Sequence, residues 1–150
     1  MRQALKHIDP ATVEFLRSRL RRVKEFAPAN AEMQQLSGIH SFFPTQRDFL
    51  LFLDFLKPHP EVAETIARRE YGDFQTPPNL SETVCRFLSS QEVSPTALVE
   101  PTFGKGSFIV SALRSFPTLH QIYGVEIYEP YCWHTKFAIL ELFIKNPGLN

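Results

Sequence analysis

The N-terminal part of the chain repeats apolar residues at helical spacing. From Val13 to Ala27, apolar side chains recur every three or four positions, and basic residues fill most positions between them. Asp9 followed by Pro10 marks the start of a helix. Aspartate accepts hydrogen bonds from the free N–H groups of the first helical turn, and proline has no N–H that needs a partner. The pattern predicts a helix from Pro10 to about Ala27. The polar stretch 28–44, with Gly38 and two prolines, predicts a linker or irregular loop.

Two more helices are predicted before the composition changes. Thr45 can cap a helix in QRDFLLFLDFLK, which must end at KPHP because proline disfavours helical geometry in the residue before it. A further helix is expected over residues 61–70, ending at a Tyr-Gly pair. We therefore place a boundary near residue 70. It separates a helical N-terminal region (1–70) from the start of an α/β domain (71–150).

The second half alternates helices with short apolar runs. The order is strand, glycine turn, helix, strand and helix. This order is typical of a parallel sheet covered by helices, so the predicted fold class is α/β. The run ALVE is expected to be a buried strand. The elements expected, in chain order, are a helix over 78–89, a strand over 97–100, a helix over 107–116, a strand over 121–127 and a helix over 129–145.

Composition is that of a soluble globular protein. Of the 150 residues 43% are hydrophobic and 21% charged, and the net charge is zero, so the whole chain offers no electrostatic case for nucleic-acid or membrane binding. Seven basic against two acidic residues between Met1 and Lys24 leave a local charge of +5. This basic face either contacts DNA phosphates or, more simply, faces solvent. No apolar run approaches the roughly 20 residues of a membrane span, and no signal peptide is visible.

Cysteine and histidine usage points to a cytoplasmic protein without a metal site. Cys85 and Cys132 are the only cysteines and belong to no paired motif, which favours free thiols in a reducing compartment. The five histidines show no metal-ligand spacing. We expect a cytoplasmic location, no membrane partner and no metal.

The stretch VEPTFGKGSF (99–108) places two glycines between a predicted strand and a predicted helix. In parallel α/β sheets, ligands bind at the carboxyl ends of the strands beside the first glycine turn. Gly104 and Gly106 lack a Cβ, so a ligand can approach the backbone there and φ can be positive. Glu126 closes the second predicted strand, where a carboxylate can accept both hydroxyls of a ribose. Alone, a Gly-x-Gly turn is common, and a strand-ending glutamate is often only solvated.

Three ligands compete for this turn. A phosphate-binding P-loop needs four residues between its glycines and then Lys-Ser or Lys-Thr, and GKGS fails that spacing. A dinucleotide fingerprint needs a third glycine, but Ile109 stands at that position. The remaining option is a nucleoside without phosphates whose other end is small and polar. Glu100 favours this option because an acid would repel a pyrophosphate. The amino acid end of S-adenosylmethionine is such a group.

Three segments together resemble the opening of a known enzyme family. GDFQTPPNL, LVEPTFGKGSF and YGVEIYEPY, in this order and at these separations, are similar to S-adenosylmethionine-dependent DNA adenine methyltransferases of restriction–modification systems. The resemblance covers residues 71 to about 140 and implies a truncated, Rossmann-like class I methyltransferase domain. The cofactor-binding residues that it implies are Phe74, Thr76 and Pro77 over the methionine end, Glu100, Thr102, Gly104 and Gly106 around the methionine moiety, Glu126 at the ribose hydroxyls and Ile127 against the adenine ring.

The catalytic motif of that family does not occur in these 150 residues. The motif is Asn or Asp, Pro, Pro, then Tyr or Phe, and KNPGLN lacks the aromatic residue. Two strands also cannot close a parallel sheet. We therefore expect no activity from this chain alone, with DNA bound through missing C-terminal regions or with help from a second methyltransferase or specificity polypeptide.

Other functions stay open on the sequence alone. One is a noncatalytic module that binds S-adenosylmethionine or joins a methyltransferase complex. Methylation of RNA, protein or a small molecule is another, because a cofactor-binding half says little about the substrate.

Overall fold

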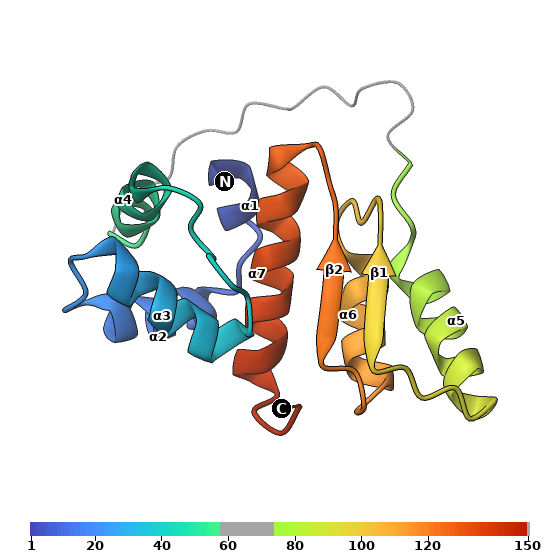
Figure 1. Ribbon diagram of the computed structural model, residues 1–150. Helices are drawn as coiled ribbons and strands as arrows, with labels where there is room; N and C mark the ends of the chain where they lie inside the picture. Colours follow the sequence, from blue (N-terminus) through green and yellow to red (C-terminus); the bar gives the residue numbers. More distant parts are fainter. Residues whose placement is uncertain (58–73, 150) are drawn as a thin grey trace.

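The computed structural model describes residues 1–57 and 74–149 (Figure 1). The expected helix over 61–70 lies outside the described residues. Helix α7 stands between the N-terminal helices and the strands with their covering helices (Figure 1). In chain order the elements are α1 (Arg2–Leu5), α2 (Pro10–Leu20), α3 (Phe26–Ser37), α4 (Gln46–Phe55), α5 (Pro78–Ser90), β1 (Ala97–Glu100), α6 (Ser107–Ser115), β2 (Gln121–Gly124) and α7 (Glu129–Lys145).

Two predicted helix starts are confirmed with their caps. The Asp9 side chain accepts a hydrogen bond from the N–H of Ala11 at 2.8 Å, and α2 begins at Pro10. Thr45 Oγ1 accepts a hydrogen bond from the N–H of Asp48 at 3.2 Å at the start of α4. Each cap satisfies one of the free N–H groups at the first helical turn.

The predicted loop over 28–44 is wrong for most of its length, because α3 runs through it. Helix α2 ends at Leu20, and α3 then forms from Phe26 to Ser37. Pro28 lies in the first turn of α3, where the N–H groups have no helical partner, so its missing N–H costs nothing. Gly38 ends the helix in the left-handed region, with φ of 69°, and donates its N–H to the Gln34 carbonyl at 2.8 Å.

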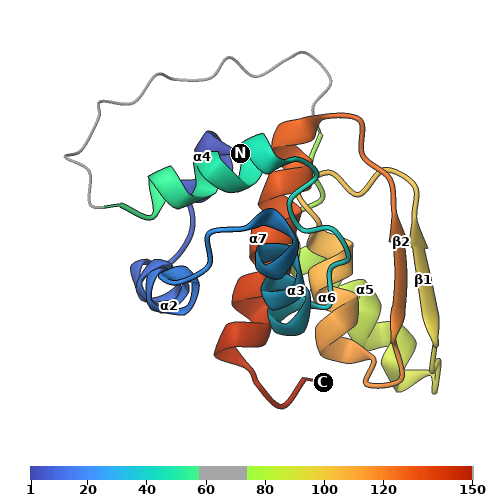
Figure 2. The ribbon, with the colours of Figure 1, turned by 60° about the vertical axis from the view of Figure 1, so that its left-hand side comes forward.

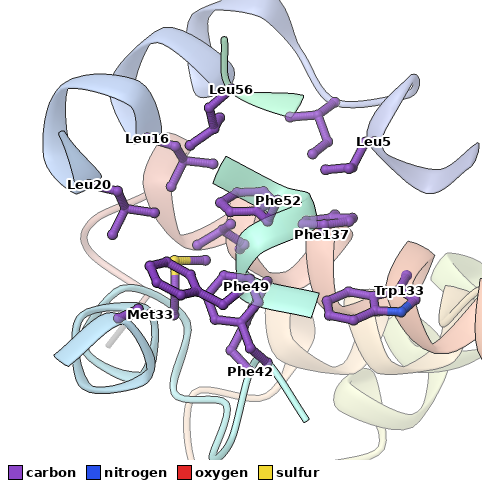
Figure 3. Packing of buried hydrophobic residues seen from close by; sticks show 14 of the residues in the cluster. Leu5, Leu16, Leu20, Met33, Phe42, Phe49, Phe52, Leu56, Trp133 and Phe137 are labelled. Atoms are coloured by element: carbon purple, nitrogen blue, oxygen red, sulfur yellow. The ribbon is translucent and has the colours of Figure 1, made fainter. Parts of the chain in front are cut away.

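One hydrophobic core joins the N-terminal helices to α7 (Figure 3). Phe52 of α4 stacks on Phe137 of α7 with 5.9 Å between ring centroids, and Trp133 lies 5.8 Å from the same ring. At the start of α2, the Asp9 N–H donates to Glu141 Oε1 at 2.6 Å.

The domain boundary near residue 70 stays a prediction, since 58–73 lie outside the described residues. The core itself contains side chains from both sides of that position.

The two strands form a small, open, parallel sheet. Ala97 pairs with Gln121 and Glu100 with Gly124. Helices α5 and α6 lie on the same side of the sheet (Figure 2), with α5 packed against α6. There Leu98 of β1 packs against the buried residues Cys85, Ala112 and Phe116. On the other face Val99 is 70% exposed, so the expected burial of this strand is wrong for that side.

The sheet is compatible with an incomplete Rossmann-like domain. Parallel sheets are normally covered on both faces, and only one face is covered within the described residues. Strand β2 ends at Gly124, earlier than the expected residue 127, although the Val125 N–H still donates to the Glu100 carbonyl at 3.0 Å. No helix within 1–57 or 74–149 is long and apolar enough to cross a membrane.

Candidate functional site

A cavity of about 390 Å³ lies where β1 and β2 end, beside the glycine turn that leads into α6. This is the edge at which open parallel sheets bind ligands. The charged residues that line the cavity are Glu100 and Glu126, so its field favours a cationic group. Six of the nine residues expected at the site line the cavity: Phe74, Thr76, Glu100, Thr102, Gly104 and Glu126.

The other three expected residues lie outside the cavity lining. Pro77 is exposed and occupies the N-cap position of α5. Gly106 is buried and occupies the N-cap position of α6, with φ of 79°. Ile127 follows the second strand with a side chain that is 99% exposed. Its role against an adenine ring stays a prediction.

The two glycines make room for side chains of this protein. A Cβ on Gly104 would lie 2.5 Å from Gln75 Oε1, and a Cβ on Gly106 would lie 2.5 Å from Thr135 Cγ2. Both glycines also adopt positive φ, at 52° and 79°. At Gly106, Thr135 fills the space beside the backbone, and the role of this glycine around the methionine moiety stays a prediction.

The two glycines should differ in their tolerance of alanine. Gly106→Ala is expected to lower the free energy of unfolding by about 1–3 kcal/mol, because positive φ strains alanine and Thr135 is a buried, β-branched residue of α7. At Gly104 the obstructing atom is the end of a flexible glutamine, so Gly104→Ala should cost less. Urea unfolding of both variants measures the difference. Equal losses would show that backbone strain, and not Thr135, makes position 106 intolerant.

Glu126 is fixed by two backbone donors. Its Oε2 accepts a hydrogen bond from the N–H of Gly104 at 2.9 Å, and its Oε1 accepts one from the N–H of Tyr128 at 2.8 Å. The carboxylate thus joins the glycine turn to the end of β2. Since an ionised carboxylate offers about four acceptor positions, each oxygen keeps room for one more donor.

Two side chains of helix α7 contact carbonyl groups of the glycine turn. Thr135 Oγ1 donates to the carbonyl of Gly104 at 3.1 Å, and His134 Nδ1 lies 3.2 Å from the carbonyl of Lys105. A carbonyl only accepts, so Nδ1 carries the proton. Burial lowers the pKa of His134 below its ordinary value, which favours the neutral ring. Lys105 also lies over the ring of Tyr131, with Nζ 5.5 Å from the centroid.

The segment 74–77 is joined to the turn by two hydrogen bonds. The N–H of Lys105 donates to Gln75 Oε1 at 2.8 Å, and Ser107 Oγ donates to the carbonyl of Thr76 at 2.8 Å. Sequence reasoning missed these side chains because glutamine and serine carry no distinctive pattern. The lining residues that it did not predict are Gln75, Phe103, Ser107, Phe108 and Tyr131.

The two cysteines lack the features of reactive thiols. Burial raises the pKa of both thiols, Cys85 and Cys132, so neither is an activated nucleophile. Within residues 1–57 and 74–149, no group of three or more His, Cys, Asp or Glu side chains could hold a metal ion. The cavity at the strand ends brings together polar groups from β1, the glycine turn, the end of β2 and the segment before α5.

A comparison with known proteins finds a partial relative. Over 62 residues the chain is 50% identical to the Type II methyltransferase M.NspV of Nostoc sp. (strain ATCC 29411 / PCC 7524). The alignment takes in 41% of this chain and only 13% of that protein. No protein-family model matches the chain, and no solved structure matches it. The similarity supports a methyltransferase of restriction–modification type.

Proposed function

We propose that this chain is the cofactor-binding part of a DNA methyltransferase of restriction–modification type. The proposed enzyme transfers a methyl group from S-adenosylmethionine to the exocyclic amine of adenine. The observation that carries the proposal is the cavity at the ends of two parallel strands, with Glu100 and Glu126 in its wall. The similarity to a Type II methyltransferase adds independent support for the reaction class.

The residues of the cavity fit this cofactor. S-adenosylmethionine carries an ammonium and a sulfonium group, and the charged lining residues are both glutamates. The oxygens of Glu126 keep one acceptor position each beside the N–H groups of Gly104 and Tyr128, which suits the two hydroxyls of a ribose. The cofactor would supply an electrophilic methyl group. The protein's part would be to bind and orient the cofactor through the residues that line the cavity.

The other expected residues have different roles in this proposal. Phe74 and Thr76 would border the methionine end, and Glu100, Thr102 and Gly104 would surround the methionine moiety. Gly106 would act indirectly by letting α7 approach the turn. Pro77 would start α5 and so fix the direction in which the segment before it leaves. Ile127 would pack against the adenine ring and become buried when the cofactor binds.

The chain alone is proposed to be inactive toward DNA. Its sequence lacks the Asn or Asp, Pro, Pro, Tyr or Phe motif that the resemblance places at the target base. Methylation of a base within a duplex also requires the base to leave the stack. Regions outside these residues, or a second polypeptide, would bind the DNA. Adenine as the target follows from the resemblance.

Calorimetric titration with S-adenosylmethionine tests the proposal directly. We expect saturable binding of S-adenosylmethionine and of S-adenosylhomocysteine, and no binding of ATP or NAD, because two glutamates would repel their phosphates. Preferential binding of either phosphate-bearing ligand would contradict the cofactor assignment. Incubation of the chain with unmodified DNA and labelled cofactor should give no transfer. Transfer of the methyl group to DNA by the chain alone would contradict the proposal that other regions or a second polypeptide are needed for activity.

A further inference from the structure

The segment 74–77 lies beside the glycine turn and contributes Phe74, Gln75 and Thr76 to the cavity lining. Phe74 lines the cavity, yet its side chain is 94% exposed, so burial does not hold it in place. Hydrogen bonds join the segment to the turn: the N–H of Lys105 donates to Gln75 Oε1, and Ser107 Oγ donates to the carbonyl of Thr76, both at 2.8 Å. These bonds connect positions about thirty residues apart in the chain.

Gln75 fits the turn closely. Its Oε1 lies where a Cβ on Gly104 would be only 2.5 Å away, so the glycine is what lets the amide reach the backbone. The same oxygen accepts the N–H of Lys105. Meanwhile Glu126 accepts the N–H of Gly104 from another direction. Successive N–H groups of the turn are therefore held by two different side chains, one from the end of β2 and one from the segment before α5.

We propose that Gln75 is a positioning residue that latches the segment 74–77 onto the glycine turn and thereby sets how long the cofactor stays bound. The inference rests on the proposed function, since it assumes that the cavity holds S-adenosylmethionine. A ligand between Phe74 and Glu100 leaves more readily when the segment swings away from the turn. Opening of that kind breaks the bond of Gln75 to Lys105, so this bond contributes to the barrier for dissociation.

The test compares two substitutions at one position. Gln75→Met has a similar length and no amide acceptor, whereas Gln75→Glu keeps an oxygen for the N–H of Lys105. Dissociation of S-adenosylmethionine is measured after addition of excess S-adenosylhomocysteine. For Gln75→Met we expect dissociation to be about tenfold faster, the effect of losing one hydrogen bond, with association changed much less. Unchanged dissociation in a folded Gln75→Met variant would overturn the latch.

Amide hydrogen exchange in the cofactor-free chain gives a second readout. The N–H of Lys105 should exchange faster in Gln75→Met than in the wild type, and Gln75→Glu should restore its protection. Ser107→Ala removes the hydrogen bond to the carbonyl of Thr76 and should also speed dissociation of S-adenosylmethionine. This variant replaces Gln75→Met in the test if Gln75→Met does not fold. Wild-type exchange at Lys105 in Gln75→Met would overturn the latch.

The two proposals fail in different ways. No binding of S-adenosylmethionine to the wild-type chain would overturn the proposed function and, with it, the role in residence time. Normal binding with equal dissociation rates in the wild type and in Gln75→Met would leave the function standing and remove only the latch.

Discussion

Replacing Phe137 with alanine is expected to lower the free energy of unfolding by about 3–5 kcal/mol, the usual cost of removing a buried aromatic ring. The ring is 2% exposed and lies at the centre of the core in Figure 3. Its centroid is 5.7 Å from that of Phe42, 5.9 Å from that of Phe52 and 5.8 Å from that of Trp133. The ring therefore has aromatic neighbours from three segments, and the surroundings of a deleted buried ring relax only partially, which leaves a cavity.

Urea unfolding followed by tryptophan fluorescence measures this effect. Trp133 is the only tryptophan of the chain and neighbours the substituted position, so the signal reports this core. Phe87→Ala is a matched control, because Phe87 lies on α5 with 60% of its side chain exposed, and it should change stability by less than about 0.5 kcal/mol. Similar losses in both variants would contradict a core centred on Phe137.

Replacing Glu126 with alanine is expected to weaken S-adenosylmethionine binding by about a hundredfold to ten-thousandfold. The estimate counts two hydroxyl donors on one carboxylate, each charge-assisted bond contributing about 1.5–3 kcal/mol. The variant also loses the bond from the Gly104 N–H, which leaves the turn less ordered before binding. The loss of the ribose contacts and the loss of order in the turn both weaken binding.

Calorimetry on three variants separates the contributions to this loss. Glu126→Gln keeps one acceptor oxygen and should fall between the wild type and Glu126→Ala. Glu92→Gln removes an exposed carboxylate beyond the end of α5 and should leave the affinity unchanged. Unchanged affinity in a folded Glu126→Ala variant would refute the role of this residue at the ribose.

The fold was predictable where local chemistry decides the structure. Asp9 and Thr45 cap their helices as expected, and the strand over 97–100 has its expected ends, because caps and short apolar runs are local signals. Helix α3 was missed because Pro28 and Gly38 usually mark loops. In fact they mark a first turn and a C-cap, at the two ends of one helix. The exposed face of β1 was missed because strand burial depends on elements elsewhere in the chain.

The site was predictable in outline, and its inner contacts were not. Glu100 and Glu126 lie at adjacent strand ends because parallel strands share that edge, which the strand pattern alone indicates. The contacts of Gln75 and Thr135 with the glycines depend on how segments distant in sequence pack together. No spacing rule links residue 75 to residue 105, so only the three-dimensional arrangement reveals that pair.

Helix α7 limits how these regions can be recombined. Thr135 of this helix holds the glycine turn, while Trp133 and Phe137 pack among aromatic rings of the N-terminal region, from α4 and from the loop before it. A chimera that takes residues 1–57 from one parent and residues 74–149 from another would join two unmatched halves of a core. Exchange between relatives should therefore preserve stability only when the aromatic residues that contact α7 are exchanged together with α7.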